Sequence, residues 1–151
     1  EIIKEIPKIE LDIIGSGPEI GNLQEITKDM EIENRVFFHG FVDEGKKKEI
    51  LKNGLCLITL SDYESFGIVI IEAVSNGLPV IASNIGSHKE ISDTLENGVT
   101  IINKDDKNKI ISTIKELRSH GYRGNDPHTY RFDWSEIIKQ YDAIYQEIEN
   151  N

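Results

Sequence analysis

Short apolar runs alternate with longer amphipathic or charged runs along most of the chain. This alternation is typical of a parallel sheet whose strands are connected by helices on both faces. The apolar runs predicted as strands are residues 10–14, 35–40, 55–60, 79–83 and 98–102. The stretches predicted as helices between them are residues 19–30, 43–53, 67–77 and 87–95, with Gly, Asn or Pro at most joints. The sequence therefore predicts an α/β fold with a doubly wound parallel sheet.

Two further helices are predicted after the last strand. Residues 105–122 carry an apolar face, and residues 133–149 form a closing helix with Asp133 or Ser135 as a suitable N-terminal cap. The apolar face of the closing helix would contain Trp134, Ile137, Ile138, Tyr141, Ile144, Tyr145 and Ile148. Because a stripe this wide is unfavourable in water, we expect a protein surface to cover it.

Length and charge limit the classes of function. The chain has 151 residues, 38% of them hydrophobic, which is enough for one sizeable core and predicts a single domain over residues 1–151. A formal net charge of -10 and a pI of about 4.8 argue against binding to nucleic acid or anionic lipid, because both need a basic surface. A bound phosphate would have to be held locally, by oriented backbone N–H groups.

The cysteine content and the apolar runs predict the compartment. The single cysteine, Cys56, lies in the apolar run G-L-C-L-I-T-L, so we expect a small core residue rather than a disulfide or zinc ligand. No apolar stretch approaches the roughly 20 residues of a membrane-spanning helix. The start of the chain, E-I-I-K-E-I-P-K-I-E, lacks the pattern of a signal peptide. We therefore expect a cytoplasmic protein.

Ligands of open parallel sheets bind beyond the carboxyl ends of the strands, so the loops there are the candidate site. The first such loop contains Gly15 and Gly17, followed by Pro18 at a favourable first helical position. Glycines there allow backbone to approach a ligand closely, but they suit any tight turn equally well. The full dinucleotide pattern G-x-G-x-x-G is absent, because Ile20 occupies the position of its third glycine.

The loop S-D-Y-E-S-F-G, residues 61–67, is more informative. Gly67 is predicted to open a helix whose first N–H groups, on Gly67, Ile68 and Val69, are free to bind an anion. Glu72 follows about a turn and a half later, where its carboxylate could accept bonds from two ribose hydroxyls, and Glu64 precedes the turn. From spacing alone, Glu64 could equally be a solvated loop charge and Glu72 an exposed helix residue.

The stretch E-S-F-G-I-V-I-I-E-A, followed by a small residue and G-x-P-V, resembles a known family. Two glutamates with seven residues between them mark the nucleotide-binding domain of the retaining group-1 glycosyltransferases of GT-B fold. The residues that match this pattern are Glu64, Glu72, Ala73, Gly77, Pro79 and Val80. The segments L-D-I-I-G-S-G-P-E, R-V-F-F-H-G-F-V, S-N-I-G-S-H-K-E-I and F-D-W-S-E-I-I-K-Q-Y-D-A-I-Y are also similar to the family, so the resemblance covers most of the chain.

The resemblance implies a role for individual residues. Glu64 would contact the donor sugar or stabilise the reacting centre, which makes it the implied catalytic residue, and Glu72 would bind the ribose hydroxyls. The implied donor-binding residues are Gly15, Gly17, Gly40, Phe41, Ser65, Phe66, Gly67, Ile68, Val69 and Glu72. The backbone around Gly40 and Phe41 would lie beside the base, while His39 is expected to be a structural residue. The family usually has glycine where this chain has Ser87, so the local shape of that loop is expected to differ.

The resemblance also implies that this chain is one half of a larger enzyme. The family has two Rossmann-like domains, and the acceptor-binding N-terminal domain would precede residue 1, as would an arginine and a lysine that neutralise the diphosphate. We therefore expect a C-terminal fragment that binds the nucleotide-sugar donor weakly and transfers no sugar alone. Any peripheral contact with a membrane would come through the missing domain. The sheet is expected to lack its first strand, which would leave unpaired edges on the strands near residues 10 and 55.

For the whole enzyme the resemblance implies sugar transfer with retention of configuration, with a nucleotide-diphosphate sugar as substrate and no cofactor. No D-x-D motif is present, so no metal is expected, and Asp105 and Asp106 are predicted to cap a helix. Two alternatives stay open. A nucleotide-sugar epimerase shares this architecture, and a non-catalytic Rossmann-like interaction module is the other, although a receiver-like module would need acidic residues where this chain has Gly15, Ser16 and Gly17.

Overall fold

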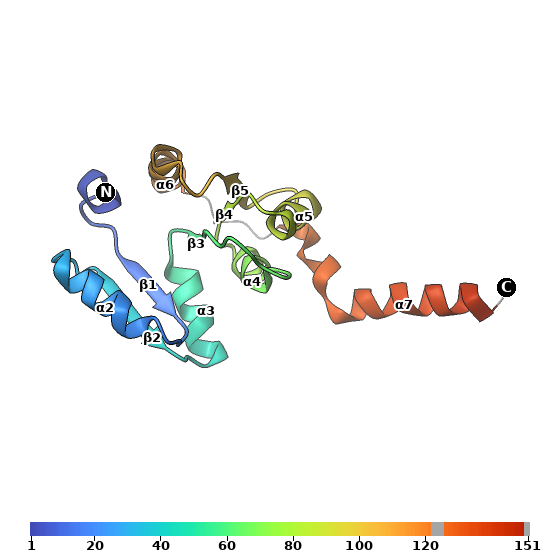
Figure 1. The fold of residues 1–151 in the computed structure, drawn as a ribbon. Helices are drawn as coiled ribbons and strands as arrows, with labels where there is room; N and C mark the ends of the chain where they lie inside the picture. The colour runs from blue at the N-terminus through green and yellow to red at the C-terminus, as the bar shows by residue number, and fades with distance from the viewer. Residues whose placement is uncertain (122–125, 150–151) are drawn as a thin grey trace. The chain divides into compact units, whose positions relative to one another are not determined.

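The computed structural model describes residues 1–121 and 126–149. The chain divides into two compact units, Glu1–Asn53 and Gly54–Asn151, and each is described by itself. Both units alternate helices with parallel strands, as Figure 1 shows. Whether they form one domain, as the sequence predicts, stays a prediction.

The first unit is built on a two-stranded parallel sheet. Its elements are α1 (Ile2–Glu5), β1 (Leu11–Ile14), α2 (Ile20–Asp29), β2 (Val36–Gly40) and α3 (Glu44–Asn53). Helix α2 connects the two strands, and Leu11 pairs with Val36 at the start of the ladder. The register shifts between Ile13 and Ile14, so that Ile14 lies opposite Gly40. This irregularity falls at the carboxyl ends of both strands.

The second unit contains a three-stranded parallel sheet in the order β3-β4-β5. Its elements are β3 (Leu57–Thr59), α4 (Ile68–Ser75), β4 (Val80–Ser83), α5 (Gly86–Thr94), β5 (Val99–Ile102), α6 (Lys107–His120), the 3-10 helix η1 (Pro127–Phe132) and α7 (Trp134–Glu149). Helix α4 contacts β4, and α5 contacts both α4 and β5. The helices therefore hold the loops at the carboxyl ends of these strands against one another.

The core of the second unit forms around the central strand. All four residues of β4 are buried, which is expected for a central parallel strand covered on both faces. Helix α4 buries Ile70, Ala73 and Val74 against it. The other buried apolar residues of this unit are Leu78, Ile91, Leu95, Ile102, Ile110 and Ile114. Each fully buried isoleucine contributes about 1.5–3 kcal/mol through removal of its side chain from water.

The predicted elements agree closely with the structure. The five predicted strands and the helices predicted between and after them are all present, most of them shorter by one or two residues at an end. Sequence analysis missed α1 and η1, which span four and six residues. Elements this short do not establish an apolar periodicity, and that periodicity is the signal from which helices are predicted.

Unpaired edges were predicted on the strands near residues 10 and 55, and this is confirmed. In the described ranges, β1 pairs only with β2, and β3 pairs only with β4. The explanation offered for these edges, a first strand that belongs to the sheet, stays a prediction.

Helix α7 is capped as predicted but is not covered as expected. The carboxylate of Asp133 accepts a hydrogen bond from the backbone N–H of Ser135 at 2.8 Å, so Asp133, and not Ser135, is the cap. Hydrogen bonds from Ser135 lower the pKa of Asp133. No residue of α7 is buried, and its large exposed apolar residues are Trp134, Ile138, Tyr141, Ile144, Tyr145 and Ile148. The surface expected to cover this stripe is not supplied by the described residues.

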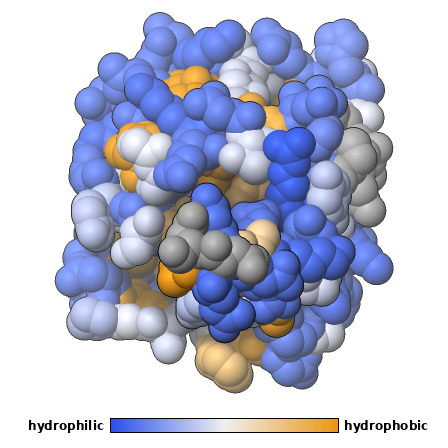
Figure 2. All heavy atoms as spheres, turned by 90° about the vertical axis from the view of Figure 1, so that its right-hand side faces the viewer, coloured by the Kyte–Doolittle hydropathy of each residue, from blue (hydrophilic) through white to orange (hydrophobic). Residues whose placement is uncertain are grey.

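The exposed surface is mainly hydrophilic, with separate apolar patches on the face drawn in Figure 2. This fits a chain with a net charge of -10. Within residues 1–121 and 126–149, no helix combines the length and the apolar character that a membrane span requires.

The buried carboxylate of Asp126 connects the start of η1 to the segment after α5 through hydrogen bonds. Asp126 is 2% exposed, and its two oxygens accept hydrogen bonds from the backbone N–H groups of Asn97 at 2.6 Å and His128 at 2.7 Å. Nε2 of His128 also lies 2.9 Å from a carboxylate oxygen of Glu96, the residue before Asn97. The segment after α5 is therefore bound to the start of η1 through charged hydrogen bonds.

We expect Asp126→Ala to lower the free energy of unfolding by about 2–4 kcal/mol, because two backbone N–H groups lose a charged acceptor. Urea unfolding followed by circular dichroism measures this change. Asp105→Ala, which removes an exposed carboxylate, is the control and should change the unfolding free energy by less than about 0.5 kcal/mol. Equal effects of the two variants would show that the buried contact contributes little.

Candidate functional site

The turn between β3 and α4 is shaped by Gly67. This residue is the N-cap of α4 and has a left-handed backbone, with φ of 83°. A Cβ atom at this position would lie 3.1 Å from Cδ1 of Ile91 and 3.5 Å from Cδ2 of His88, both on α5. Position 67 therefore favours glycine for two reasons, its left-handed backbone conformation and the close approach of α5.

The N-terminus of α4 is open. The first helical hydrogen bond from this turn runs from the N–H of Ile70 to the carbonyl of Gly67, at 2.9 Å. The N–H groups of Gly67, Ile68 and Val69 donate no hydrogen bond to the part of the chain that the structure describes. These groups carry the positive end of the helix dipole, and the side chains of Ile68 and Val69 are exposed. These N–H groups are therefore available to bind an anion, and their role as a phosphate site stays a prediction.

Glu64 lies over this turn and is held in place by two contacts. One carboxylate oxygen accepts a hydrogen bond from the N–H of Phe66 at 3.3 Å. Its backbone carbonyl accepts a hydrogen bond from the hydroxyl of Ser87 at 2.8 Å. Ser87 stands where the resemblance implies glycine, and the structure shows what this departure does: its hydroxyl ties the start of α5 to the loop of Glu64.

Glu72 lies on the same side of α4 as Ile68, because residues four apart in a helix occupy one face. That side carries the exposed Ile68 side chain, while Ile70, Ala73 and Val74 face the core. Glu72 itself is half-buried. One glutamate of the motif, Glu72, thus lies on the helix with the open N–H groups, and the other, Glu64, lies in the loop that leads into it.

The neighbouring loop residues are exposed, and one has a partner that sequence analysis did not predict. Ser65 is exposed, and Phe66 is half exposed. The Phe66 ring packs edge-to-face against Phe132 of η1, with 6.2 Å between centroids and an interplanar angle of 78°. Since η1 was not predicted, its role as support for this loop could not be predicted either.

Lys104 and Asp62, which lies in the same loop, form an ion pair. Asp62 follows β3 and Lys104 follows β5, so the pair joins two segments at the carboxyl edge of the sheet. The hydrogen bond to Asp62 raises the pKa of Lys104. Sequence analysis missed this pair, although the available signal was an acid and a base that each directly follow an apolar strand.

The first unit holds the remaining predicted site residues. The N–H of Gly15 donates to the carbonyl of Gly40 at 2.8 Å, and both glycines have positive φ, 117° and 62°. This bond brings the predicted glycine turn and the predicted base-binding segment together at the ends of β1 and β2. Gly17 is exposed, and Phe41 is 90% exposed.

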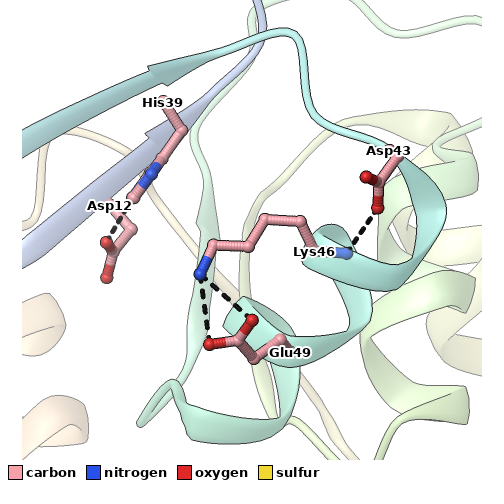
Figure 3. A network of polar contacts seen from close by, with 5 residues as sticks. All are labelled: Asp12, His39, Asp43, Lys46 and Glu49. Atoms are coloured by element: carbon pink, nitrogen blue, oxygen red, sulfur yellow. Dashed lines mark hydrogen bonds and ion pairs between the residues drawn. The ribbon is translucent and has the colours of Figure 1, made fainter.

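Figure 3 shows a polar pair on these two strands that sequence analysis did not single out. Nε2 of His39 lies 2.6 Å from a carboxylate oxygen of Asp12, so His39 has a partner on the adjacent strand. The same view shows Asp43 accepting a hydrogen bond from the N–H of Lys46 at 2.8 Å, which caps α3. The ammonium of Lys46 lies 3.0 Å from Glu49, one turn further along the helix.

The described residues of the candidate site include neither a group of metal ligands nor a reactive cysteine. Within the described ranges, no three His, Cys, Asp or Glu side chains are grouped so that they could hold a metal ion. Whether the reaction uses a metal stays a prediction. Asp106 caps α6 as predicted, because its carboxylate accepts from the N–H of Lys109 at 2.9 Å. Burial raises the pKa of Cys56 to about 11, so it remains a thiol.

Three comparisons connect this geometry to known proteins. The family model described as "Glycosyl transferases group 1" matches residues 1–129. N-acetyl-alpha-D-glucosaminyl L-malate synthase of Bacillus anthracis is 30% identical over 98% of this chain, which spans 40% of that relative. An uncharacterized glycosyltransferase of Methanocaldococcus jannaschii is 28% identical over 96% of this chain, again with 40% of the relative covered.

Solved structures show the same fold. Sucrose-phosphate synthase from Thermosynechococcus elongatus aligns with 99% of this chain at a TM-score of 0.76 and 23% identity, over 41% of its own length. The pneumococcal O-GlcNAc transferase GtfA aligns with 99% of this chain at a TM-score of 0.67 and 22% identity, over 31% of its length. The predicted fold class, α/β with parallel sheets as in one half of a GT-B enzyme, is confirmed. With residues 1–129 matched by its model, the chain belongs to the group 1 family of glycosyl transferases.

Proposed function

We propose that this chain binds the nucleotide-sugar donor of a glycosyltransferase that moves the sugar to an acceptor with retention of configuration. Family membership supports the transferase activity. The observation that supports donor binding is the open N-terminus of α4 at Gly67, with Glu64 before it and Glu72 on the same helix. The open N-terminus of α4 suits a diphosphate, Glu64 suits a sugar, and Glu72 suits a ribose.

The distal phosphate is proposed to bind the N–H groups of Gly67, Ile68 and Val69. In a chain with a net charge of -10, backbone dipoles can hold an anion without a basic surface. The same dipoles stabilise the charge that develops on the diphosphate when the sugar departs. Because the donors are fixed by the helix, they need no reorganisation during the reaction.

The two glutamates are proposed to have different roles. Glu72 accepts hydrogen bonds from the ribose hydroxyls and so contributes to binding. Glu64 contacts the donor sugar or the positive charge that develops at its reacting carbon, and so contributes to catalysis. The bonds from Phe66 and Ser87 fix the loop that carries Glu64 before the donor arrives. Gly15, Gly17, Gly40 and Phe41 of the first unit stay predicted donor contacts.

The whole protein is proposed to contain more than this chain. The chain spans about 40% of the curated relatives described above. We infer that a further domain binds the acceptor and that this chain alone transfers no sugar. We also propose that the enzyme acts in the cytoplasm, uses no cofactor and needs no metal.

Calorimetric titration with UDP, GDP and ADP tests donor binding directly. We expect one of the three nucleotides to release heat with a stoichiometry of one. The absence of binding to all of them would favour an interaction module. Analysis of the products of the full-length protein then separates transfer from epimerisation, and the anomeric configuration of the product tests retention.

Alanine variants of the two glutamates test their separate roles. We expect Glu72→Ala to weaken donor binding by about 1.5–3 kcal/mol, because a charged hydrogen-bond acceptor is lost. Glu64→Ala should mainly lower kcat. Glu116→Ala, on the exposed side of α6, is the control and should change neither quantity. If both site variants behave like Glu116→Ala, the glutamates are ordinary surface residues.

Gly67→Ala tests the shape of the phosphate seat. The added Cβ would be strained by the positive φ and would lie 3.1 Å from Ile91, so the turn must shift. We expect a loss of about 1–3 kcal/mol in the free energy of unfolding, together with weaker binding of the nucleotide diphosphate. Gly21→Ala is the control, because its Cβ meets open space on α2, and it should be neutral or slightly stabilising. Unchanged nucleotide affinity in Gly67→Ala would contradict the proposed seat.

A further inference from the structure

The second unit contains a histidine that neither the motif nor the proposed function uses. His88 is the third residue of α5, and its side chain is completely buried. One edge of its ring faces the end of β4. There Nδ1 lies 3.2 Å from the hydroxyl oxygen of Ser83 and 3.1 Å from the carbonyl oxygen of the same residue.

The surroundings of Nδ1 fix where the ring carries its hydrogen. The hydroxyl of Ser83 donates its only proton to the carbonyl of Ser61, at 2.6 Å. Its oxygen and the Ser83 carbonyl can therefore only accept a hydrogen bond from the ring. Nδ1 consequently carries a hydrogen in both the neutral and the charged ring. The neutral ring then has its lone pair on Nε2, and a second proton can bind only there.

The opposite edge of the ring lies against Gly67, the N-cap of α4. Cδ2, which is bonded to Nε2, lies 3.5 Å from the position of a Cβ atom on Gly67. Nε2 is buried and has no hydrogen-bond partner among the described residues. A buried polar atom without a partner costs about 1–3 kcal/mol, so a group at this position needs an explanation. The unpartnered nitrogen thus belongs to a ring that packs behind Gly67, the residue from which the free N–H groups of α4 begin.

Charged groups surround this position, but none satisfies Nε2. The charged residues on the elements around the ring are Asp62 and Glu64 in the loop after β3, Glu72 on α4, Lys89, Glu90 and Asp93 on α5, and Lys104 after β5. In the described ranges, the hydrogen bonds of His88 run only to Ser83. Asp62 is already paired with Lys104. The described residues therefore supply no charged partner for the ring at Nε2.

We propose that His88 is a positioning residue for the diphosphate, and that Nε2 takes up a proton from solvent when the diphosphate occupies the N-terminus of α4. This inference rests on the proposed function. Without an anion, a charged ring would be buried beside the positive end of a helix, which is unfavourable. With the diphosphate in place, the sign of the local field reverses. The imidazolium then supplies a positive charge below Gly67 and holds the turn in its binding conformation.

The coupling between nucleotide binding and protonation of His88 predicts how nucleotide affinity changes with pH. Because the diphosphate binds the protonated ring more tightly, binding raises the affinity of His88 for a proton. Nucleotide affinity is therefore expected to be greater at low pH than at high pH. Titrations of the nucleotide itself contribute to the same pH profile, so a variant of His88 is needed to assign the effect.

The first test measures proton uptake on binding. The natural full-length protein is titrated with the nucleoside diphosphate that binds among UDP, GDP and ADP, in buffers of different ionisation enthalpy. At neutral pH, up to about one proton per nucleotide should be taken up, since a single imidazole titrates. In His88→Asn, the amide N–H can still donate to Ser83 while Nε2 is removed, so uptake should vanish and Kd should rise about tenfold. His120→Gln, an exposed histidine at the end of α6, is the control and should match the unmodified protein.

The second test needs no substitution. Nitrogen NMR of the histidine rings should show His88 protonated at Nδ1 alone in the free protein, and at both nitrogens in the nucleotide complex. A ring protonated at Nε2 before binding, or unchanged by binding, would overturn the inference even if His88→Asn fails to fold. A nucleotide that binds without proton uptake overturns this inference alone. If UDP, GDP and ADP all fail to bind, the proposed function fails, and the role of His88 fails with it.

Discussion

Between the turn at Gly67 and helix α5 there is no room for a further side-chain carbon, since a Cβ atom would lie 3.1 Å from Ile91. The rest of the candidate site follows from this close contact. It aims the first N–H groups of α4 away from the core, and it places Ser87 where its hydroxyl can hold the carbonyl of Glu64. A larger residue at position 67 would have to displace the Ile91 side chain and would be strained by the positive φ.

Electrostatics explain why the site is built from backbone. The chain has a net charge of -10, and Lys104, which follows β5, is paired with Asp62 of the loop. Helix dipoles supply positive potential that does not depend on side chains and does not attract other anions over long distances. If His88 is charged only when the diphosphate is bound, the protein also avoids a permanent buried charge, whose desolvation is costly.

Sequence patterns predicted the fold and the motif because both depend on local order. Apolar runs of four to six residues separated by helical stretches were enough to place every strand, and the glycine at 67 with its two glutamates marked the turn. The contacts that support this turn were not predictable in the same way. Ser83 and His88 lie five residues apart but meet only because α5 folds back on β4, and Asp62 and Lys104 are 42 positions apart. Such pairs depend on tertiary packing, which periodicity does not report.

The edge-to-face contact between Phe66 and Phe132 has a practical meaning for how this domain is delimited. The family model ends at residue 129, so Phe132 lies just beyond the boundary that this model alone would draw. A protein cut at that boundary would retain all the expected donor contacts and lose the aromatic wall behind one of them. The conformation of the loop that carries Phe66 is thus set in part by a segment that a motif-based definition of the domain leaves out.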